Sequence, residues 1–320
     1  MRARWMAVLW CLAPGLAQVK LTQGPDRIEV QIDGQPFTTL FMGSDVTKPY
    51  LHPLRSASGK VVTRYYPMEN REGERRDHPH QRGLWFSHGD VNGYDFWANE
   101  VSQKGPNKGR IVLDKVISLR SGRRQGSLEV SFNWLDPAGK PILNERRTMV
   151  FHADPRLRVV DFDIVLTALE KVKFGDTKEG TFALRLAPSL EEPVRGAPET
   201  PRRTGKMVNA EGLEGERQVW GKRSAWVDYF GEVEGEKLGV AIFDHPSNPK
   251  HPTFWHSRSY GLFAANIFGE HDFMADKSRD GSLTLEPGGK LRFRYRVVIH
   301  PGDCQSAGIA EMYKKYAAGQ

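Results

Sequence analysis

The sequence predicts an all-β protein, a large antiparallel two-sheet β-sandwich with a short C-terminal helix. Two observations indicate this fold. Apolar and polar residues alternate along most of the chain, as on half-buried antiparallel strands, and Gly, Pro, Asp and Asn separate the alternating runs. We count roughly 15 to 18 such runs, which is more than a small barrel holds and fits two packed sheets.

The strands are clearest at the start, in the middle and near the end of the chain. The most regular alternating runs are residues 28–32, 128–134, 142–151, 160–168 and 291–299. The second and third of these runs flank the turn residues Asp136-Pro137-Ala138-Gly139, which predict a β-hairpin.

Only the end of the chain predicts a helix, from Ser306 to Ala318. Its apolar residues fall at the i, i+3, i+4 and i+7 positions of one helix face, namely Ile309, Met312, Tyr313 and Tyr316. Gly319 then suits the end of the helix.

The first 17 residues predict a secretory signal peptide. Arg2 and Arg4 give a basic start, residues 5–12 are apolar, and Gly15 and Ala17 put small residues before a cleavage site. We therefore expect residues 18–320 to form a single β-sandwich domain in the periplasm or outside the cell. Residues 191–205, rich in Pro, Arg and Glu, fit a surface loop of that domain.

Charge and composition narrow the possible partners. The formal net charge is +7, but the basic residues are scattered and form no stripe, so we expect no nucleic-acid partner. After Ala17 no apolar run approaches the length of a membrane span. Cys304 is the only cysteine after the signal peptide, so an intrachain disulfide cannot form. The oligomeric state is left open.

Residues 77–93 are the main candidate for a functional site. They combine three imidazoles with charged, amide and indole groups: His78, His80, His88, Arg82, Trp85 and Asn92. A core strand cannot hold so many polar groups without partners, whereas loops often carry binding sites. Two further polar segments, residues 174–180 and 244–256, follow the same pattern.

We expect these three segments to share one pocket. The predicted catalytic residues are His80 or His88 as proton donor and Glu179 as base, with Lys178 steering the carboxylate. The predicted substrate-binding residues are Arg82, Trp85, Asn92, Arg185, His245, Trp255 and His256.

Three kinds of function remain open from the residues alone. The first is acid–base catalysis on a sugar, of the epimerase, lyase or hydrolase type. The second is a non-catalytic carbohydrate-binding module that uses the same indoles and arginines. The third is a metal-dependent enzyme with His78, His80 and His88 as ligands, although their spacing matches no sharp metal motif. No cofactor is predicted, and the expected ligand is a small molecule or an oligosaccharide.

Three long segments carry a resemblance to a known family. HPHQRGLWFSHGDVNGYDFW, FGDTKEGTFALRLAP and FDHPSNPKHPTFWHSRSYGLFAANIFG resemble a bacterial exported family catalogued as PmoA-like and labelled "methane oxygenase PmoA". The methane monooxygenase subunit of that name is an integral membrane protein, and this chain has no matching apolar spans, so we do not expect methane oxidation. The all-β pattern also resembles the galactose-mutarotase-like supersandwich. Epimerases of that fold pair a histidine acid with a glutamate base, which implies His88 and Glu179 here.

Overall fold

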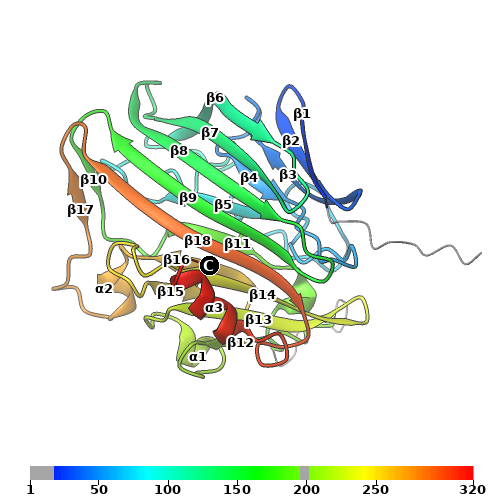
Figure 1. Ribbon diagram of the computed structural model, residues 1–320. Coiled ribbons are helices and arrows are strands. Elements are labelled where there is room, and N and C mark those ends of the chain that lie inside the picture. Colours follow the sequence, from blue (N-terminus) through cyan, green and yellow to red (C-terminus); the bar gives the residue numbers. More distant parts are fainter. Residues whose placement is uncertain (1–17, 195–201, 320) are drawn as a thin grey trace, which may run out of the picture.

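The structure, a computed structural model, describes residues 18–194 and 202–319, which fold into two facing β-sheets (Figure 1). The predicted signal peptide lies outside the described residues, and so does the middle of the predicted surface loop, residues 195–201. Export and the single-domain organisation stay predictions.

The first sheet has eight antiparallel strands in the order β1-β2-β3-β4-β5-β11-β16-β15. They are β1 (Val19–Gln23), β2 (Arg27–Ile32), β3 (Gln35–Phe41), β4 (Tyr50–His52), β5 (Leu84–His88), β11 (Gly180–Arg185), β16 (Leu262–Asn266) and β15 (Phe254–Ser257). The first five follow chain order, whereas the last three come from later parts of the chain. Strands from all three polar segments therefore meet in one half of this sheet.

The second sheet also has eight antiparallel strands, in the order β12-β13-β14-β18-β9-β8-β7-β6. They are β12 (Lys206–Asn209), β13 (Trp226–Val233), β14 (Glu236–Asp244), β18 (Lys290–Pro301), β9 (Arg158–Ala168), β8 (Pro141–His152), β7 (Gln125–Leu135) and β6 (Arg110–Arg120). The alternating runs near residues 130, 146, 164 and 295 all form strands of this sheet. The predicted hairpin joins β7 to β8.

The main hydrophobic core lies between the two sheets. Alternation along the strands sends one set of side chains inward, and the rings of Phe182 on β11 and Tyr295 on β18 stack at 4.4 Å across the interface. Phe86 on β5 and Phe293 on β18 meet across the same interface at 5.4 Å, with their rings tilted by 57°. Burying one such side chain contributes roughly 1.5–3 kcal/mol, so this interface is the main source of stability.

The remaining elements are short. β10 (Val172–Phe174) and β17 (Leu283–Leu285) form a separate two-stranded ribbon, and the helices are α1 (Glu216–Val219), α2 (Glu270–Phe273) and α3 (Ile309–Ala317). A 3-10 turn covers Pro188–Leu190. No helix in the described ranges is long and apolar enough to cross a membrane. The predicted all-β sandwich and the C-terminal helix are confirmed.

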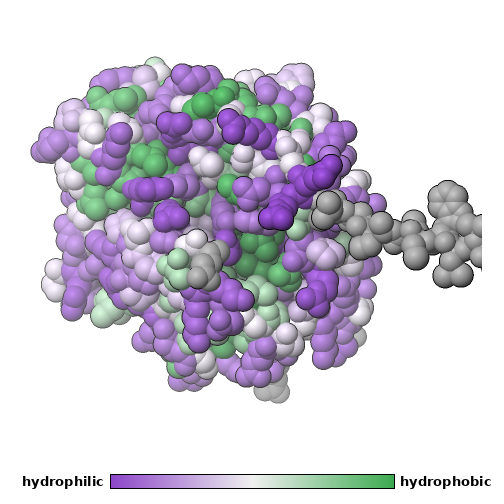
Figure 2. Space-filling view, viewed as in Figure 1, coloured by the Kyte–Doolittle hydropathy of each residue, from purple (hydrophilic) through white to green (hydrophobic). Residues whose placement is uncertain are grey.

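α3 packs on the outer face of the second sheet, the face that points away from the first sheet (Figure 1). Ile309 and Tyr316 of α3 join Trp226, Phe243 and Val298 in a second apolar cluster there. Figure 2, seen from the same side, shows polar side chains over most of this face with apolar patches between them.

Candidate functional site

The outer face of the first sheet, which points away from the second sheet, gathers the polar segments. On β5, Leu84 and Phe86 point into the main core while Trp85 points outward. On β11, the same alternation sends Leu184 inward and Arg185 outward. The segment before β5 and the turn before β11 both bring side chains to this outer face.

Two fully buried arginines lie beneath this face and share one carboxylate. Asp77 Oδ1 accepts from Arg64 Nη1 at 2.7 Å and from Arg185 Nη2 at 3.4 Å. Gln81 Oε1 accepts a further bond from Arg185. Burial disfavours the charged form of Asp77, but a hydrogen bond with His78 and the positive charge of Arg185 outweigh it, so the pKa of Asp77 lies below its usual value.

Arg185, Tyr260 and His78 form a stacked column that reaches solvent. The Arg185 guanidinium lies 4.7 Å from the centre of the Tyr260 ring. The His78 ring stacks on the Tyr260 ring at 5.5 Å with an interplanar angle of 8°. His78 is exposed, and its Nδ1 lies 3.2 Å from Asp77 Oδ2. The column thus offers a flat aromatic surface that is fixed from below by charge.

His80 is buried next to this column and is neutral. Burial and the nearby Lys48 ammonium lower the pKa of His80 to about 2. Gln103 Nε2 lies 2.9 Å from His80 Nδ1, while Gln103 Oε1 accepts from a backbone amide, which assigns the imidazole proton to Nε2. His80 is therefore a hydrogen-bond donor through Nε2 rather than a store of an acidic proton.

Glu179 is the half-exposed carboxyl of the site. Burial raises its pKa, whereas the Lys178 ammonium, 3.6 Å from Oε1, and His78 act in the opposite direction. Its negative charge in turn raises the pKa of Tyr260, after the larger effect of burial. Glu179 is thus within electrostatic reach of both rings of the column.

The turn that carries Glu179 is anchored at its backbone. The amide of Gly89 donates to the Glu179 carbonyl at 2.7 Å, and His256 Nδ1 donates to the Lys178 carbonyl at 2.9 Å. A Cβ at Gly89 would lie only 2.9 Å from the Cβ of Glu179, so this close approach requires glycine. The backbone of the turn is thus held by Gly89, directly after β5, and by His256 of β15.

A model of the family of unknown function DUF6807 matches residues 27–314. The chain belongs to this family. No curated protein matches the DUF6807 chain. The match does not bear on the PmoA-like label, which stays a prediction.

Solved structures similar to this DUF6807 chain share little sequence with it. The galactosidase domain of the α-galactosidase–sucrose kinase AgaSK has 9% identity and a TM-score of 0.46, over 88% of this chain and 42% of that chain. Galactose 1-epimerase from Lactobacillus acidophilus NCFM has 7% identity and a TM-score of 0.40, over 90% and 100% of the two chains. A galactose mutarotase-like protein from Clostridium acetobutylicum has 11% identity and a TM-score of 0.38, over 88% and 98%.

The coverage differs between these matches. The DUF6807 chain spans 39% of the α-galactosidase from Lactobacillus brevis and 42% of the AgaSK chain. The function proposed below rests on the side chains of the DUF6807 chain itself.

Several predicted site residues of the DUF6807 chain do not reach the outer face of the first sheet. His88 lies in the main core, where its ring packs on Phe268 at 4.6 Å and Nε2 donates to the Gly175 carbonyl at 2.8 Å. Burial lowers its pKa to about 4. Trp255 points inward as well, because strand alternation places its indole in the core, with Nε1 donating to Ser224. These positions correct the expectation that both residues contact a substrate.

Asn92 and His245 also lie elsewhere. Asn92 joins the turn after β5 to the segment at β10, because its side chain bonds the Lys171 carbonyl and the Lys173 amide. His245 follows β14 of the second sheet and packs against Tyr316 of α3 at 5.1 Å. The expected single pocket is therefore wrong for His245, which lies against the outer face of the opposite sheet.

The other predicted residues are brought together in supporting positions. Arg82 forms a two-bond ion pair with Glu100 at 3.0 and 2.7 Å. Trp85 is covered by Trp97, whose ring centre is 5.0 Å away. His256 is buried and holds the turn of Lys178, and burial lowers the pKa of His256 to about 4.

The predicted metal set of His78, His80 and His88 is divided by the sheet. The rings of His78 and His80 are 5.7 Å apart on the outer side, whereas His88 is in the core. In the described part of the chain no group of three His, Cys, Asp or Glu side chains is arranged to hold a metal ion.

Sequence reasoning missed Arg64, Tyr260 and Gln103. Arg64 gave a signal in the sequence, since a charged residue stands two positions after the apolar pair Val61-Val62. Tyr260 and Gln103 gave no such signal in the sequence, because each lies in a loop and reaches the site only through tertiary contacts.

Proposed function

We propose that this protein is an exported carbohydrate-active enzyme that carries out acid–base catalysis on a sugar bound at the outer face of the first sheet. One observation carries the proposal: the half-exposed carboxyl of Glu179, with a raised pKa, lies within electrostatic reach of the solvent-facing His78–Tyr260 stack. A flat ring pair next to a tuned carboxyl suits a sugar, whose C–H face packs on rings while its hydroxyl groups meet polar atoms.

Each residue of the site then has a distinct role. Glu179 takes a proton from the sugar, and its raised pKa makes it a stronger base than an ordinary glutamate. His80 donates a hydrogen bond from Nε2 to the oxygen on which negative charge develops, as a neutral imidazole can. Arg185 and Asp77 act as positioning residues, because they fix Tyr260 and His78 from below.

The test is a screen for turnover with one matched pair of variants. Aldoses, keto-sugars, glycosides and uronides are assayed by polarimetry and NMR. Glu179→Gln, which keeps the shape and removes the base, is expected to reduce kcat by about 10²-fold or more. Glu286→Gln changes a surface glutamate that also pairs with a lysine, Lys171, and is expected to leave kcat unchanged. Full activity in Glu179→Gln would refute the assignment.

A second candidate function, carbohydrate binding without turnover, is favoured by one observation. The two buried histidines nearest the site, His80 and His256, have pKa values lowered to about 2 and about 4, so neither carries an acidic proton at neutral pH. If the protein is a pure binding module, the wild type shows no turnover. Glu179→Gln is then expected still to bind oligosaccharides in calorimetry. Turnover by the wild type that is lost in Glu179→Gln excludes this candidate.

The export part of the proposal rests on residues 1–17, with their basic start, apolar run and small residues before Gln18. It predicts that the chain purified from the periplasm or medium of an expressing bacterium begins at Gln18. A full-length chain retained in the cytoplasm would contradict it, and N-terminal sequencing distinguishes the two.

A further inference from the structure

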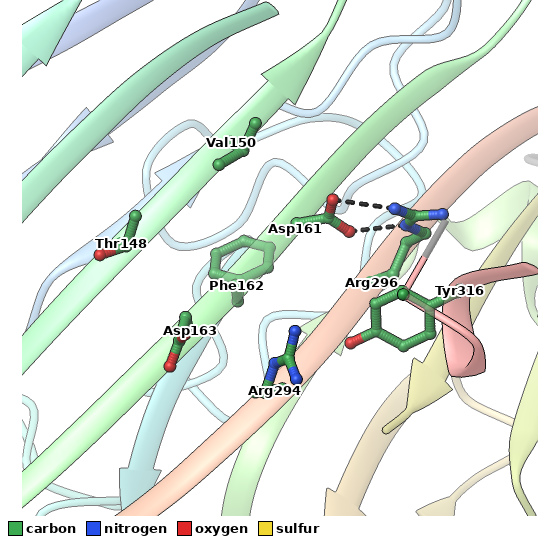
Figure 3. A pocket seen from close by; sticks show the side chains of 9 residues that line it. Thr148, Val150, Asp161, Phe162, Asp163, Arg294, Arg296 and Tyr316 are labelled. Atoms are coloured by element: carbon green, nitrogen blue, oxygen red, sulfur yellow. Dashed lines mark hydrogen bonds and ion pairs between the residues drawn. The ribbon is translucent and has the colours of Figure 1, made fainter. Parts of the chain in front are cut away.

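A polar cavity lies on the outer face of the second sheet (Figure 3), whereas Glu179 belongs to the outer face of the first sheet. Its volume is about 280 Å³, and it is formed by β8, β9, β18 and the end of α3. The lining residues are Thr148, Val150, Asp161, Phe162, Asp163, Arg294, Arg296, Tyr316 and Gly319.

The charges around this cavity leave one guanidinium without a partner. Arg296 forms two bonds with Asp161, at 2.6 and 2.9 Å (Figure 3). Asp163 is paired with Arg292, two residues from Arg294 on the same face of β18. Within residues 18–194 and 202–319, no carboxylate or other side chain forms an ion pair or hydrogen bond with the Arg294 guanidinium. The cavity therefore carries one uncompensated positive charge.

A buried hydroxyl without a hydrogen bond lies beside this charge. Tyr316 is 6% exposed, and its hydroxyl has no hydrogen-bond partner in the described part of the chain. Figure 3 shows this hydroxyl directed toward Arg294. The Tyr316 ring is held from behind by His245 at 5.1 Å and by the Arg296 guanidinium at 4.6 Å. A buried donor without an acceptor is costly, so the site is built to receive an acceptor from a ligand.

We propose that this cavity binds a small hydroxylated carboxylate, a sugar acid by chemical class. The carboxylate lies between the Arg294 guanidinium and the Tyr316 hydroxyl, a pairing for which planar guanidinium groups are well suited. Asp161 and Asp163 remain able to accept hydrogen bonds from the ligand's hydroxyl groups, and Thr148 can donate one. The volume is at the low end for ligand sites, which limits the ligand to about one sugar unit.

The same charges favour a carboxylate over a phosphate. Arg294 supplies one uncompensated positive charge, which balances a monoanion. A phosphate dianion would bring a second negative charge close to Asp161 and Asp163, and like charges in a partly enclosed cavity repel. This inference is independent of the proposed function, because the two sites share no residue.

The test uses calorimetry with glucuronate, its neutral counterpart glucose, and inorganic phosphate. Glucuronate is expected to bind the wild type, and glucose and phosphate to bind at least about tenfold more weakly, because a hydrogen bond to a charged group is worth roughly that factor. Arg294→Gln is expected to weaken glucuronate binding by about tenfold or more. Tyr316→Phe keeps the packed ring, removes only the hydroxyl and is expected to weaken binding several-fold.

Arg146→Gln is the matched control, since Arg146 is an exposed arginine of β8 that pairs with Glu129, and neither of the two residues lines the cavity. Its glucuronate affinity is expected to equal that of the wild type, and Glu179→Gln is expected to have no effect either. Unchanged affinity in both Arg294→Gln and Tyr316→Phe would overturn the assignment. Phosphate binding more tightly than glucuronate would overturn the ligand class, and loss of binding only in Glu179→Gln would move the ligand to the other face.

Discussion

At the scale of single residues, burial decides what each polar side chain of the candidate site can do. Burial holds the pKa of His80 at about 2, so this imidazole stays neutral. The same effect raises the pKa of Glu179, while the Lys178 ammonium opposes it. Burial thus makes His80 a neutral hydrogen-bond donor and Glu179 a stronger base near the His78–Tyr260 stack. The residue types alone do not reveal these two roles.

Lys178→Met tests this tuning. Glu179 acts as a base only when ionised, so activity falls as the pH drops through its pKa. Removing the cation that favours the ionised form raises that pKa further, so the acid limb of the kcat/KM profile is expected to move to higher pH. The measurement is the pH–rate profile, with exposed Lys237→Met as the control. A limb that stays in place in Lys178→Met would contradict the role of Lys178.

At the scale of elements, β7 and β8 contain an ion pair inside the sandwich. Alternation along β8 makes Leu143, Glu145 and Arg147 point inward together. Glu145 accepts from Arg147 Nε at 2.6 Å and from the Trp134 indole of β7 at 2.8 Å. These groups are buried, so the pair depends on both partners being present.

Glu145→Ala is expected to reduce the free energy of unfolding by about 3–5 kcal/mol, because it leaves the buried Arg147 charge without a partner. Glu129→Ala is the control, because it removes the partner of Arg146, an arginine of β8 whose side chain is exposed. It is expected to lower the free energy of unfolding by at most about 1 kcal/mol. Urea unfolding measures both. Equal losses in the two variants would show that burial of the first pair does not matter.

Local patterns in the sequence predicted the strands, because alternation is a property of neighbouring residues. They did not predict which strands become neighbours. β5 lies beside β11, and β11 beside β16, through contacts between residues far apart in the chain. Within the segment 244–256, the chain also passes from one sheet to the other, so His245 and His256 end on different sheets. From the sequence we therefore predict Lys178, Glu179, Arg185 and His80 as site residues, but group them with residues that lie in other layers of the fold.

At the scale of the whole molecule, the fold buries several histidines in their neutral form. Burial lowers the pKa values of His52, His80, His88 and His256 to about 3, 2, 4 and 4. His300, next to Asp228, is the opposite case, since its pKa is raised above the usual value although burial acts against it. The folded state as a whole thus binds fewer protons than the unfolded chain just below pH 6.5.

Stability is therefore expected to fall on acidification. A histidine whose folded pKa is lowered contributes stability that is complete above its unfolded pKa, near 6.5, and is lost as the pH falls toward the folded pKa. In that window, each of the four histidines lowers the free energy of unfolding by up to about 1.4 kcal/mol per pH unit. His300, whose pKa is raised, offsets the contribution of one of them. Urea unfolding at pH 7 and pH 5 measures the change. Equal or greater stability at pH 5 would contradict the neutral state of these groups.

The central claim is that the outer face of the first sheet binds a sugar on the His78–Tyr260 stack next to Glu179. The most direct measurement is calorimetric titration of the best sugar from the turnover screen into the wild type, Tyr260→Ala and His78→Ala, with His152→Ala on the other outer face as control. The account predicts at least about tenfold weaker binding in the first two variants, because losing the apolar contact between one ring and the C–H face of the sugar costs roughly 1.5–3 kcal/mol. It predicts unchanged affinity in His152→Ala. Wild-type affinity in both Tyr260→Ala and His78→Ala would contradict it.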